Sequence, residues 1–589
     1  MGLPVPRRDL TLPPVLPDPG RLSVVRKEAE VNREETYDIV IVGGGHNGIT
    51  AAAYLAKCGL SVCVLEERPE AGGGQENTEP MAGVRIDPAA TYLYAAVAPG
   101  FEQLELWKYG FRMSWASRIG RIFQEPDVVR RMGSATTDGV VPLDEKDLTG
   151  WATLMGVGTQ HPFLKELLRA VYWCPPHPVD MEQTEDDIPW VQVLKQKAPE
   201  IWSESLREMT LFDLYDEFLG SEAFKVYQAT VAWYSGAAPH WQGMAIPSLA
   251  GAASLMLGGV SPPRGGMHQY AHSILRCAIA HGAQIRTCCP VEEIIVRSGR
   301  AAGVRLGDTA AWGEKTIWAD KAVLSAVDVK STFLDLIGPR HMDVSFLQRV
   351  KDISLKGGSI YVAHILLREP PRYGPKFAAR GEEPASQMVY PCDDRQLLLE
   401  HIADVDSRKV TPSLEPDKML WLSTGSKLDE PTCCTIPGAF LESPFYFMVP
   451  APEYHVGGPE AVNKMKPEID AAIIRSWSEV APNVQDNVTA YWSNSPYDSE
   501  QRNTGLIGGN WYATRHCPDQ WWGQRPLPEL ARYRTPIEGL YLCHQTSHPG
   551  GLCLMAVPYN LMHILIEDGI AEPGDWWYPS PWYIPEKKK

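Results

Sequence analysis

Apolar positions near the start of the chain follow the pattern of a strand, a turn, a helix and a second strand. Residues 37–42 form an apolar run that is typical of a buried parallel strand, and residues 49–56 are alanine-rich with helical character. Gly59 ends that helix, and a second apolar run at residues 61–65 stops at Glu66. Strand, glycine-rich turn, helix, strand and terminal acid together predict a βαβ unit.

The pattern changes between about residues 115 and 255, where helices and loops are predicted. Thr210 is followed by Asp213 and by apolar residues at helical spacing up to residue 219, which predicts a capped helix. Six tryptophans are scattered through this stretch: Trp151, Trp173, Trp190, Trp202, Trp233 and Trp241.

An α/β pattern returns at residues 265–338, where a helix around 270–281 leads into short strand-like runs. Residues 345–525 form a second insertion of mixed strand and loop. Residues 539–543 are another buried strand, and a helix follows around 558–567.

Composition excludes several classes of protein. Hydrophobic residues make up 44% of the 589 residues and charged residues 22%, which is ordinary for a globular chain and unlike a disordered, collagenous or coiled-coil protein. The formal net charge of −17 argues against nucleic acid or anionic lipid as the main partner.

Twelve cysteines without CxxC spacing predict reduced thiols, and we expect no metal ligands. The proline-rich first 20 residues lack the apolar segment of a secretory signal. The most apolar run, residues 245–260, is too short and interrupted to span a bilayer. We therefore expect a soluble, cytoplasmic protein.

Gly43, Gly45 and Gly48 have the GxGxxG spacing of a dinucleotide-binding turn. The first glycine allows the tight turn, the second lets the backbone approach a pyrophosphate, and the third lets the helix pack on the strand. The helix N-terminus supplies free N–H groups and the positive end of its dipole. Glu66 can accept hydrogen bonds from ribose hydroxyls, and it would repel the 2′-phosphate of NADP.

Arg68 and the glycines Gly72 and Gly73 follow at once, an order that resembles the FAD-binding N-terminus of the amine-oxidase and phytoene-desaturase superfamily. Further segments are similar to phytoene-dehydrogenase-like flavoproteins, a family with carotenoid desaturase, isomerase, saturase, ketolase and terpene dehydrogenase members. These segments are residues 45–48, 52–55, 263–267, 281–287, 291–294, 534–543, 547–551 and 559–560.

The resemblance implies FAD as the cofactor and gives roles to further residues. Val291 is similar to the family residue whose backbone hydrogen-bonds the adenine, although a valine there also suits a plain strand core. Gly550 and Gly551 would let the backbone lie against the flavin ring, or would form a simple turn. His544 stands where the family usually has glycine, and it is either a donor to the flavin phosphates or a pocket residue.

Two other segments depart from the family pattern. Gly74 and Gln75 stand where arginine is common, and residues 552–555 replace further glycines and small residues. The flavin could therefore sit differently, above a pocket shaped for another substrate.

The implied fold is α/β, with a discontinuous, glutathione-reductase-like FAD-binding Rossmann domain and an inserted α+β substrate domain. We expect the FAD-binding domain at residues 36–115, 262–345 and 526–572, and the substrate domain at 116–261 and 346–525. A proline-rich arm at 1–35 and an aromatic, finally basic tail at 573–589 flank them.

The implied activity is dehydrogenation, or the reverse saturation, of a C–C bond in a lipophilic, isoprenoid-like substrate by hydride transfer with flavin N5. A flavin-dependent polyene isomerase without net redox change and a non-enzymatic prenyl-binding escort protein are the alternatives. A second dinucleotide motif is lacking, so electrons would leave to a separate acceptor, which is a quinone, oxygen or another protein.

His548 and Tyr559 are the candidate catalytic residues. Next to the flavin, His548 could transfer a proton near neutral pH. Alternatively, its ring only hydrogen-bonds to the backbone of a turn and transfers no proton. Tyr559 either orients substrate or only packs. The aromatic residues of the tail and of the middle insertion could form a peripheral membrane contact. The alternative is that they are simply part of the core. The oligomeric state is also open.

Overall fold

The structure is a computed structural model of the whole chain. It describes residues 35–90, 93, 97–113, 135–136, 139–140, 143–156, 163–234, 236–257, 263–312, 315–354, 359–372, 394–406, 420–421, 434–436, 438–442, 445–448, 459–551 and 555–586. Residues 1–34 of the predicted arm and residues 552–554 lie outside the described part.

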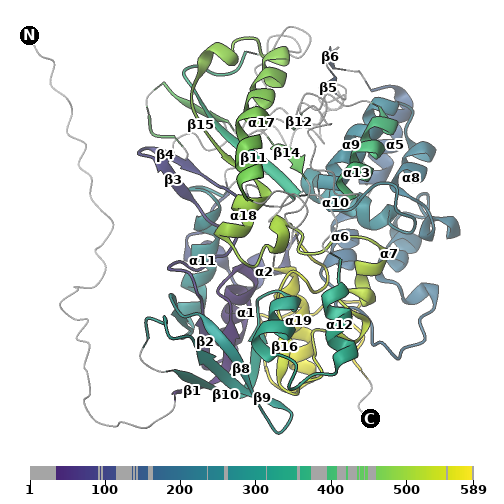
Figure 1. The fold of residues 1–589 in the computed structure, drawn as a ribbon. Coiled ribbons are helices and arrows are strands. Elements are labelled where there is room, and N and C mark those ends of the chain that lie inside the picture. The colour runs from purple at the N-terminus through teal and green to yellow at the C-terminus, as the bar shows by residue number, and fades with distance from the viewer. Residues whose placement is uncertain are drawn as a thin grey trace, which may run out of the picture.

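A seven-stranded sheet lies in the lower half of the molecule in Figure 1, together with helices such as α1 (His46–Lys57) and α19 (Ala556–Glu567). Its order is β7-β2-β1-β10-β9-β8, and β16 also pairs with β10. All pairs among β7, β2, β1, β10 and β16 are parallel, whereas β8 and β9 form an antiparallel extension. The strands are β1 (Glu35–Val42), β2 (Val62–Leu65), β7 (Gln284–Arg286), β8 (Val291–Arg297), β9 (Arg300–Leu306), β10 (Thr316–Ser325) and β16 (Leu540–Leu542).

Side chains on a strand point alternately to the two faces of the sheet, and on β1 both sets are apolar, so the sheet is buried on both faces. Ile39 and Ile41 of β1 belong to the cluster that contains the helices α1, α11 (Met267–Ala280) and α19. Val40 and Val42 point to the other face, where β8, β9, the π-helix at 331–337 and α12 (Val344–Asp352) cover them. The predicted βαβ unit is confirmed as β1–α1–β2.

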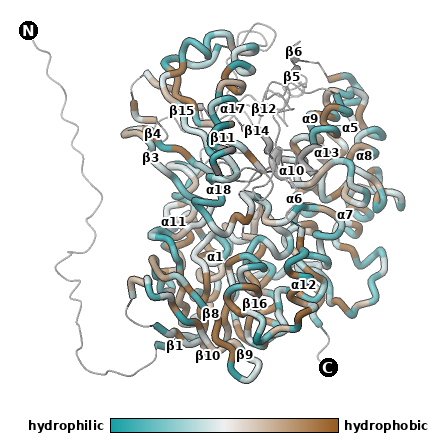
Figure 2. The backbone as a smooth tube through the Cα atoms, viewed as in Figure 1, coloured by the Kyte–Doolittle hydropathy of each residue, from teal (hydrophilic) through white to brown (hydrophobic). Residues whose placement is uncertain are grey.

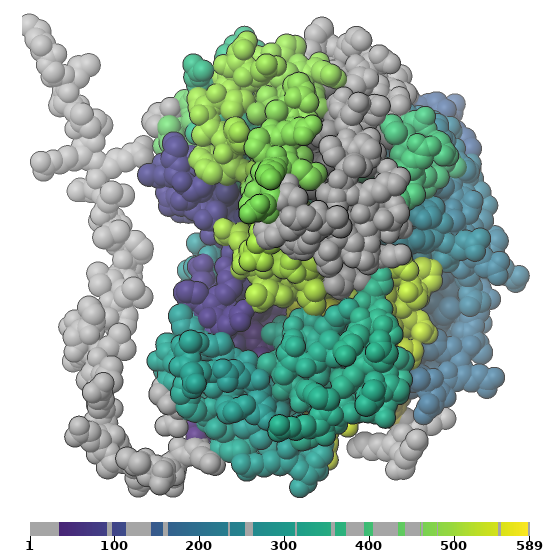
Figure 3. Space-filling view, in the orientation of Figure 1, coloured from purple at the N-terminus to yellow at the C-terminus, as the bar shows by residue number. Residues whose placement is uncertain are grey.

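A second sheet lies above the first one in Figure 1. It has the order β12-β14-β11-β13, with β15 also paired to β11, and every pair is antiparallel. Figure 3 shows this upper part in contact with the lower part. Its elements are β11 (Ser359–Leu367), β12 (Leu420–Trp421), β13 (Phe440–Glu442), β14 (Phe445–Met448), α17 (Pro459–Val480), β15 (Val488–Asn494) and α18 (Pro496–Arg502).

A hairpin from the N-terminal segment belongs to this upper part. Val84 and Ile86 lie in a small apolar cluster with Leu366 of β11 and with Leu441 of β13. The hairpin consists of β3 (Thr78–Met81) and β4 (Val84–Ile86). Although it was expected within the FAD-binding domain, it packs against the second sheet; the domain boundaries themselves stay a prediction.

Helices from the middle stretch form a third layer, on the right in Figure 1. Thr210 caps α8 as predicted, because its hydroxyl accepts from the Asp213 N–H at 3.1 Å and the Asp213 carboxylate accepts from the Thr210 N–H at 2.8 Å. The helices of the middle stretch are α5 (Glu145–Met155), α6 (Leu164–Tyr172), α7 (Pro189–Lys197), α8 (Leu211–Phe218), α9 (Glu222–Tyr234) and α10 (Ala245–Leu257). From the second insertion, α13 (Arg395–Asp406) joins this layer (Figure 1). The short elements are α2 (Pro99–Gln103), β5 (Ala135–Thr136) and β6 (Gly139–Val140).

The aromatic tail packs on the lower half of the molecule. Trp576 stacks on Tyr54 of α1 with ring centroids 6.1 Å apart, and Trp577 meets the same ring edge-on at 5.7 Å. Trp151, Trp173 and Trp233 of the middle stretch are buried as well. Trp151, Trp173 and Trp233 therefore serve as core, and Trp576 and Trp577 pack against it half-buried. Figure 2 shows hydrophobic stretches along the strands of the lower sheet. Among the described residues, no helix is long and apolar enough to cross a membrane.

We predict that the folded protein loses stability as the pH falls from 7.5 to 5.5. Burial lowers the pKa of His364 and of His563 to about 3, whereas an unfolded histidine titrates near about 6.5. Below that pH the unfolded chain takes up protons that the folded chain does not. The free energy of unfolding should then fall by up to ~1.4 kcal/mol per pH unit for each such histidine. Thermal midpoints at three pH values test this, and a constant midpoint would contradict it.

Candidate functional site

At two of its glycines, Gly43 and Gly48, the turn between β1 and α1 leaves no room for a side chain. Gly43 has a φ of +98°, and a Cβ on Gly48 would lie 2.1 Å from the Gly43 carbonyl oxygen. Gly45 differs, since a Cβ there would meet only the Gly73 Cα, at 3.8 Å. Gly48 therefore lets the helix pack on the turn, while Gly45 leaves open space at the start of α1.

Glu66 lies at the end of β2, directly beside this turn. Its Oε2 accepts from the Gly44 N–H at 2.8 Å, and its Oε1 accepts from the Arg68 N–H at 2.8 Å. Burial raises the pKa of the carboxyl group, and these two backbone donors oppose the shift. Each oxygen keeps a lone pair for a further donor, such as a ribose hydroxyl.

The loop that follows lies against the turn. The Gly72 N–H donates to the Gly44 carbonyl at 2.8 Å, and Gly72 has a φ of +136°. Arg68 donates to the Glu76 carboxylate at 2.6 Å, and Arg502 at the end of α18 donates to the same carboxylate at 3.0 Å. Glu76 thus joins the loop to the upper part of the molecule, and the Arg68 guanidinium is committed to this ion pair.

One cavity of about 470 Å³ begins at these elements, a volume in the range of small-molecule sites. Seven of the predicted site residues line it: Gly43, Gly45, Glu66, Arg68, Gly73, Val291 and His544. The described lining does not include Gly48, Gly72, His548, Gly550, Gly551 or Tyr559.

Several lining residues were not predicted from the sequence. They come from segments that become neighbours only in the fold, and they include His46, Asn47, Leu93, Asp328, Ile360, Asn503, Trp511 and Tyr512. Only His46 and Asn47 had an available signal, since they occupy variable positions of the GxGxxG motif.

The residues present fit an FAD at this cavity. Asn47 Oδ1 and Gln75 Oε1 are buried polar atoms of the wall without a hydrogen-bond partner among the described residues. The open space at Gly45 faces an α1 N-terminus that has no side-chain cap. Glu66 adds an acceptor for ribose. The N–H groups at the start of α1 suit the pyrophosphate, and the amide and carboxylate oxygens suit the hydroxyl groups of the sugar.

His544 follows β16 and is a neutral ring. Burial, with a smaller contribution from the charge of Arg525, lowers its pKa to about 3. Its Nδ1 accepts from the Thr546 N–H at 3.2 Å, which places the ring proton on Nε2. His544 therefore offers a donor to the cavity; whether that donor meets the flavin phosphates or a substrate stays open.

His548 does not lie in the described cavity wall. Its ring is fully buried and is flanked by Trp521 and Trp522, with centroids 5.5 and 5.0 Å away. Burial and the charge of Arg525 hold the pKa of His548 well below its usual range. The expected titration near neutral pH does not fit this environment, and a catalytic role for His548 stays a prediction without support from the geometry.

Gly550 and Gly551 face protein rather than the cavity. A Cβ on Gly550 would lie 2.4 Å from His516 Nε2, and one on Gly551 would lie 2.8 Å from the Tyr512 Cα. The glycine pair is explained by the close approach of residues 511–525. The expected contact with the flavin ring is not seen in the described cavity lining.

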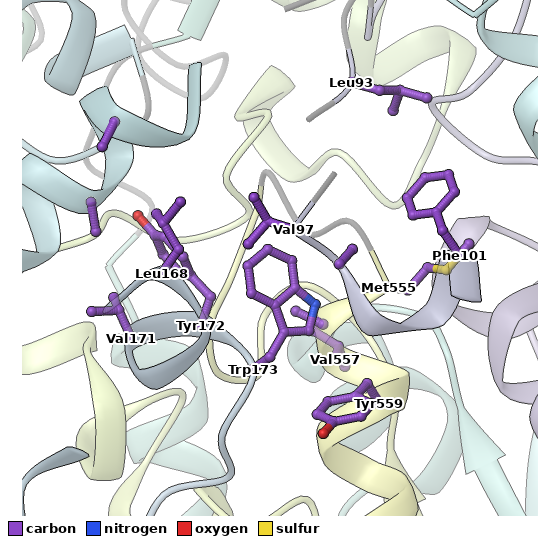
Figure 4. Packing of buried hydrophobic residues seen from close by; sticks show 14 of the residues in the cluster. Leu93, Val97, Phe101, Leu168, Val171, Tyr172, Trp173, Met555, Val557 and Tyr559 are labelled. Carbon is purple, nitrogen blue, oxygen red and sulfur yellow. The ribbon is translucent and has the colours of Figure 1, made fainter. Parts of the chain in front are cut away.

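Tyr559 belongs to the core between α19 and the tail. Its hydroxyl donates to the Tyr578 carbonyl at 3.2 Å, and Figure 4 shows its ring below Trp173 and Val557. Burial raises its pKa above the usual value for tyrosine. Packing, one of the two predicted roles, accounts for these contacts.

Arg525 is a buried residue that sequence reasoning missed. Its guanidinium donates to the Tyr512 carbonyl at 2.9 Å and to the Gln545 carbonyl at 2.8 Å. Since Tyr512 and Gln545 both line the cavity, this arginine ties two wall segments together. It stands in a loop without any periodic pattern, so the sequence contained no signal for it.

Comparisons with known proteins agree with this geometry. Residues 41–105 match the family described as NAD(P)-binding Rossmann-like domain. One of the subunits of limonene dehydrogenase from Castellaniella defragrans is 23% identical over 94% of this chain and 98% of that protein. Hydroxyneurosporene desaturase of Cereibacter sphaeroides is 27% identical over 61% of this chain and 72% of that protein. The chain thus resembles phytoene desaturase-like FAD-dependent oxidoreductases.

Other relatives and solved structures extend the match over nearly the whole chain. Pyridine nucleotide-disulfide oxidoreductase domain-containing protein 2 of Rattus norvegicus is 27% identical over 90% of this chain and 94% of that protein. An oxidoreductase from Methanosarcina mazei has a TM-score of 0.53 at 16% identity, covering 90% of this chain and 99% of its own. The structure of putrescine oxidase bound to putrescine has a TM-score of 0.51 at 15% identity, covering 91% of this chain and 99% of its own. These structures share the fold, and the predictions of family, fold class, FAD and oxidoreductase activity are confirmed.

We predict that Gly45→Val abolishes flavin binding in this phytoene desaturase-like protein. A branched side chain would fill the space at the start of α1 that the pyrophosphate needs, and β-branching resists the turn. Acid extraction and chromatography should return one FAD per wild-type chain, without FMN or NAD, and almost none from the variant. Gly523→Val is the matched control, because a Cβ at Gly523 has no neighbour within 4 Å. Full flavin content in a folded Gly45→Val protein would contradict the assignment.

We predict that His548→Ala lowers stability and flavin content while the rate per bound FAD stays near the wild-type value. Removing the ring leaves a void beside Trp521 and Trp522, at a cost of about 2–4 kcal/mol. Thermal melts and single-turnover flavin reduction, normalised to bound FAD, measure both effects. If His548 transfers a proton instead, the normalised rate would fall by about 10²- to 10⁴-fold with the thermal midpoint preserved.

Proposed function

We propose that this FAD-dependent oxidoreductase dehydrogenates, or in the opposite direction saturates, a C–C bond of a lipophilic, isoprenoid-like substrate. The names of two relatives support this choice, since one is part of a limonene dehydrogenase and the other is a hydroxyneurosporene desaturase. Both names describe redox chemistry, so they do not favour the isomerase or escort alternatives.

The observation that carries the proposal is the distribution of charge along the cavity. The charged side chains of the described lining come from two segments, residues 66–68 and 328–335, which flank the glycine-rich turn in the sheet. The wall contributed by β11 and by residues 505–512 offers Ile360, Leu506, Trp511 and Tyr512 instead. An apolar hydrocarbon can desolvate against such a wall without leaving a buried charge unpaired.

The roles of the chain's own residues follow from this arrangement. FAD, when bound, supplies the acceptor for a hydride. Gly45, Asn47 and Glu66 would hold its pyrophosphate and ribose, while Ile360 and Trp511 would orient the substrate and exclude water. His46 and His544 stay neutral, because burial lowers their pKa values to about 4 and about 3. The described wall thus offers donors and apolar surface rather than a histidine that titrates near pH 7.

The electrons would then pass to a separate acceptor. A second dinucleotide-binding motif is lacking in the sequence, which supports a quinone, oxygen or a protein as the acceptor. Contact with a membrane, from which a lipophilic substrate could be taken, remains part of the proposal. The packed tail residues Trp576 and Trp577 do not support the tail as that contact.

We predict that isoprenoid hydrocarbons bleach the flavin absorbance under anaerobic conditions. Monoterpenes, acyclic carotenoids and retinoids are the panel, with a short aliphatic diamine as a polar comparison. Trp511→Ala should raise the concentration needed for half-maximal bleaching by about tenfold, because apolar contact area is lost. Trp312→Ala is the matched control, since Trp312 is 45% exposed and does not line the cavity.

Two results would contradict the proposal. One is bleaching by the diamine with none by any isoprenoid. The other is conversion of a polyene to its isomer without consumption of an added electron acceptor, which would favour the isomerase.

A further inference from the structure

Three side chains that can bind a metal ion converge outside the cavity lining. Glu70 comes from the loop after β2, and His268 and His272 lie one turn apart on α11. One ligand atom from each residue lies within 4.8 Å of the other two. His268 Nδ1 is 3.0 Å from Glu70 Oε1, and the two imidazole centroids are 4.0 Å apart.

A simple hydrogen bond between His268 and Glu70 explains only part of this arrangement. It gives no reason for a second imidazole that lies against the first, with ring centroids 4.0 Å apart. A neutral imidazole has the lone pair that a metal ion needs.

We propose that Glu70, His268 and His272 bind one divalent ion of the zinc class. Two imidazole nitrogens and one carboxylate oxygen form a donor set that zinc and cobalt accept, whereas magnesium and calcium prefer oxygen alone. Ligand atoms around a tetrahedral zinc lie about 3.4 Å apart. Ligand atoms that lie within 4.8 Å of one another have to close by at most about 1.4 Å to reach this spacing. Three protein ligands leave one position for water.

The site would brace one wall of the FAD cavity. Glu70 belongs to the same loop as Arg68, Gly73 and Gly74, which line that cavity, and the loop meets α11 at this point. A Cβ on Gly72 would lie 3.8 Å from the His268 ring, so loop and helix are already in contact. The ion would join segments nearly two hundred residues apart, which is why the sequence predicted no metal ligand.

Cobalt titration of the untagged, FAD-loaded full chain tests the proposal. After treatment with a chelator, Co²⁺ should bind once per chain and produce d–d absorption at wavelengths longer than the flavin bands, and Zn²⁺ should displace it. His272→Ala and Glu70→Gln should each weaken Co²⁺ binding by more than about 100-fold, because a ligand is removed. His268 is left intact in these variants, since it is buried. His341→Ala, an exposed histidine elsewhere, should bind like the wild type.

Flavin content and thermal midpoint confirm that each variant is folded. Absence of saturable Co²⁺ or Zn²⁺ binding to the wild type would overturn the proposal. Equal Co²⁺ affinity in the wild type and in both variants would overturn it too, because the ion would then bind elsewhere. Neither readout depends on turnover, so the result is independent of the proposed substrate.

Discussion

The close approach of three backbone segments is the constraint on which the rest of the structure depends. The turn at Gly43–Gly48, the loop at Gly72–Gly73 and the end of β2 meet where a Cβ would collide, 2.1 Å from a carbonyl oxygen at Gly48 and 2.9 Å from the Gly45 Cα at Gly73. Two backbone N–H groups of this junction donate to Glu66, and the N-terminus of α1 beside them has no side-chain cap. Because the central strands are buried on both faces, the junction cannot relax without disturbing the sheet.

A buried carboxylate attaches the upper part of the molecule to this junction. Glu76 is 5% exposed and accepts from both Arg68 and Arg502, so the loop beside the dinucleotide motif and α18 share one ion pair. Arg525 acts in the same way inside the lower wall, where carbonyl oxygens on two segments accept from its guanidinium. Multiple donors in a fixed plane suit arginine to such joints. The cavity is therefore shaped as much by these ties as by the residues that face it.

What the sequence could predict depended on whether the information was local. The βαβ unit and the capped helix at Thr210 are encoded by periodicity and spacing over about ten residues, and both are present in the structure. A resemblance to family segments located the block around His548 but not the direction in which its side chains point. His548 lies between two tryptophans and Gly550 against Arg525, because residues 511–525 fold over that block. No pattern within the block could reveal a neighbour supplied by tertiary packing.

The distribution of charge in the cavity also shows how an acidic chain can hold a dianionic pyrophosphate. Of the charged side chains in the described lining, Glu66, Glu67, Asp328 and Asp335 are acidic, and Arg68 is already paired with Glu76. Side-chain cations are thus a poor source of attraction there. The positive end of α1 and its uncapped N–H groups remain, and they act at short range where the dielectric constant is low. A net charge of −17 repels phosphate in solution, but it does not cancel donors that are fixed within hydrogen-bond distance. The glycines matter in this chain because, at this end of the cavity, they admit the phosphates to the backbone groups best placed to bind them.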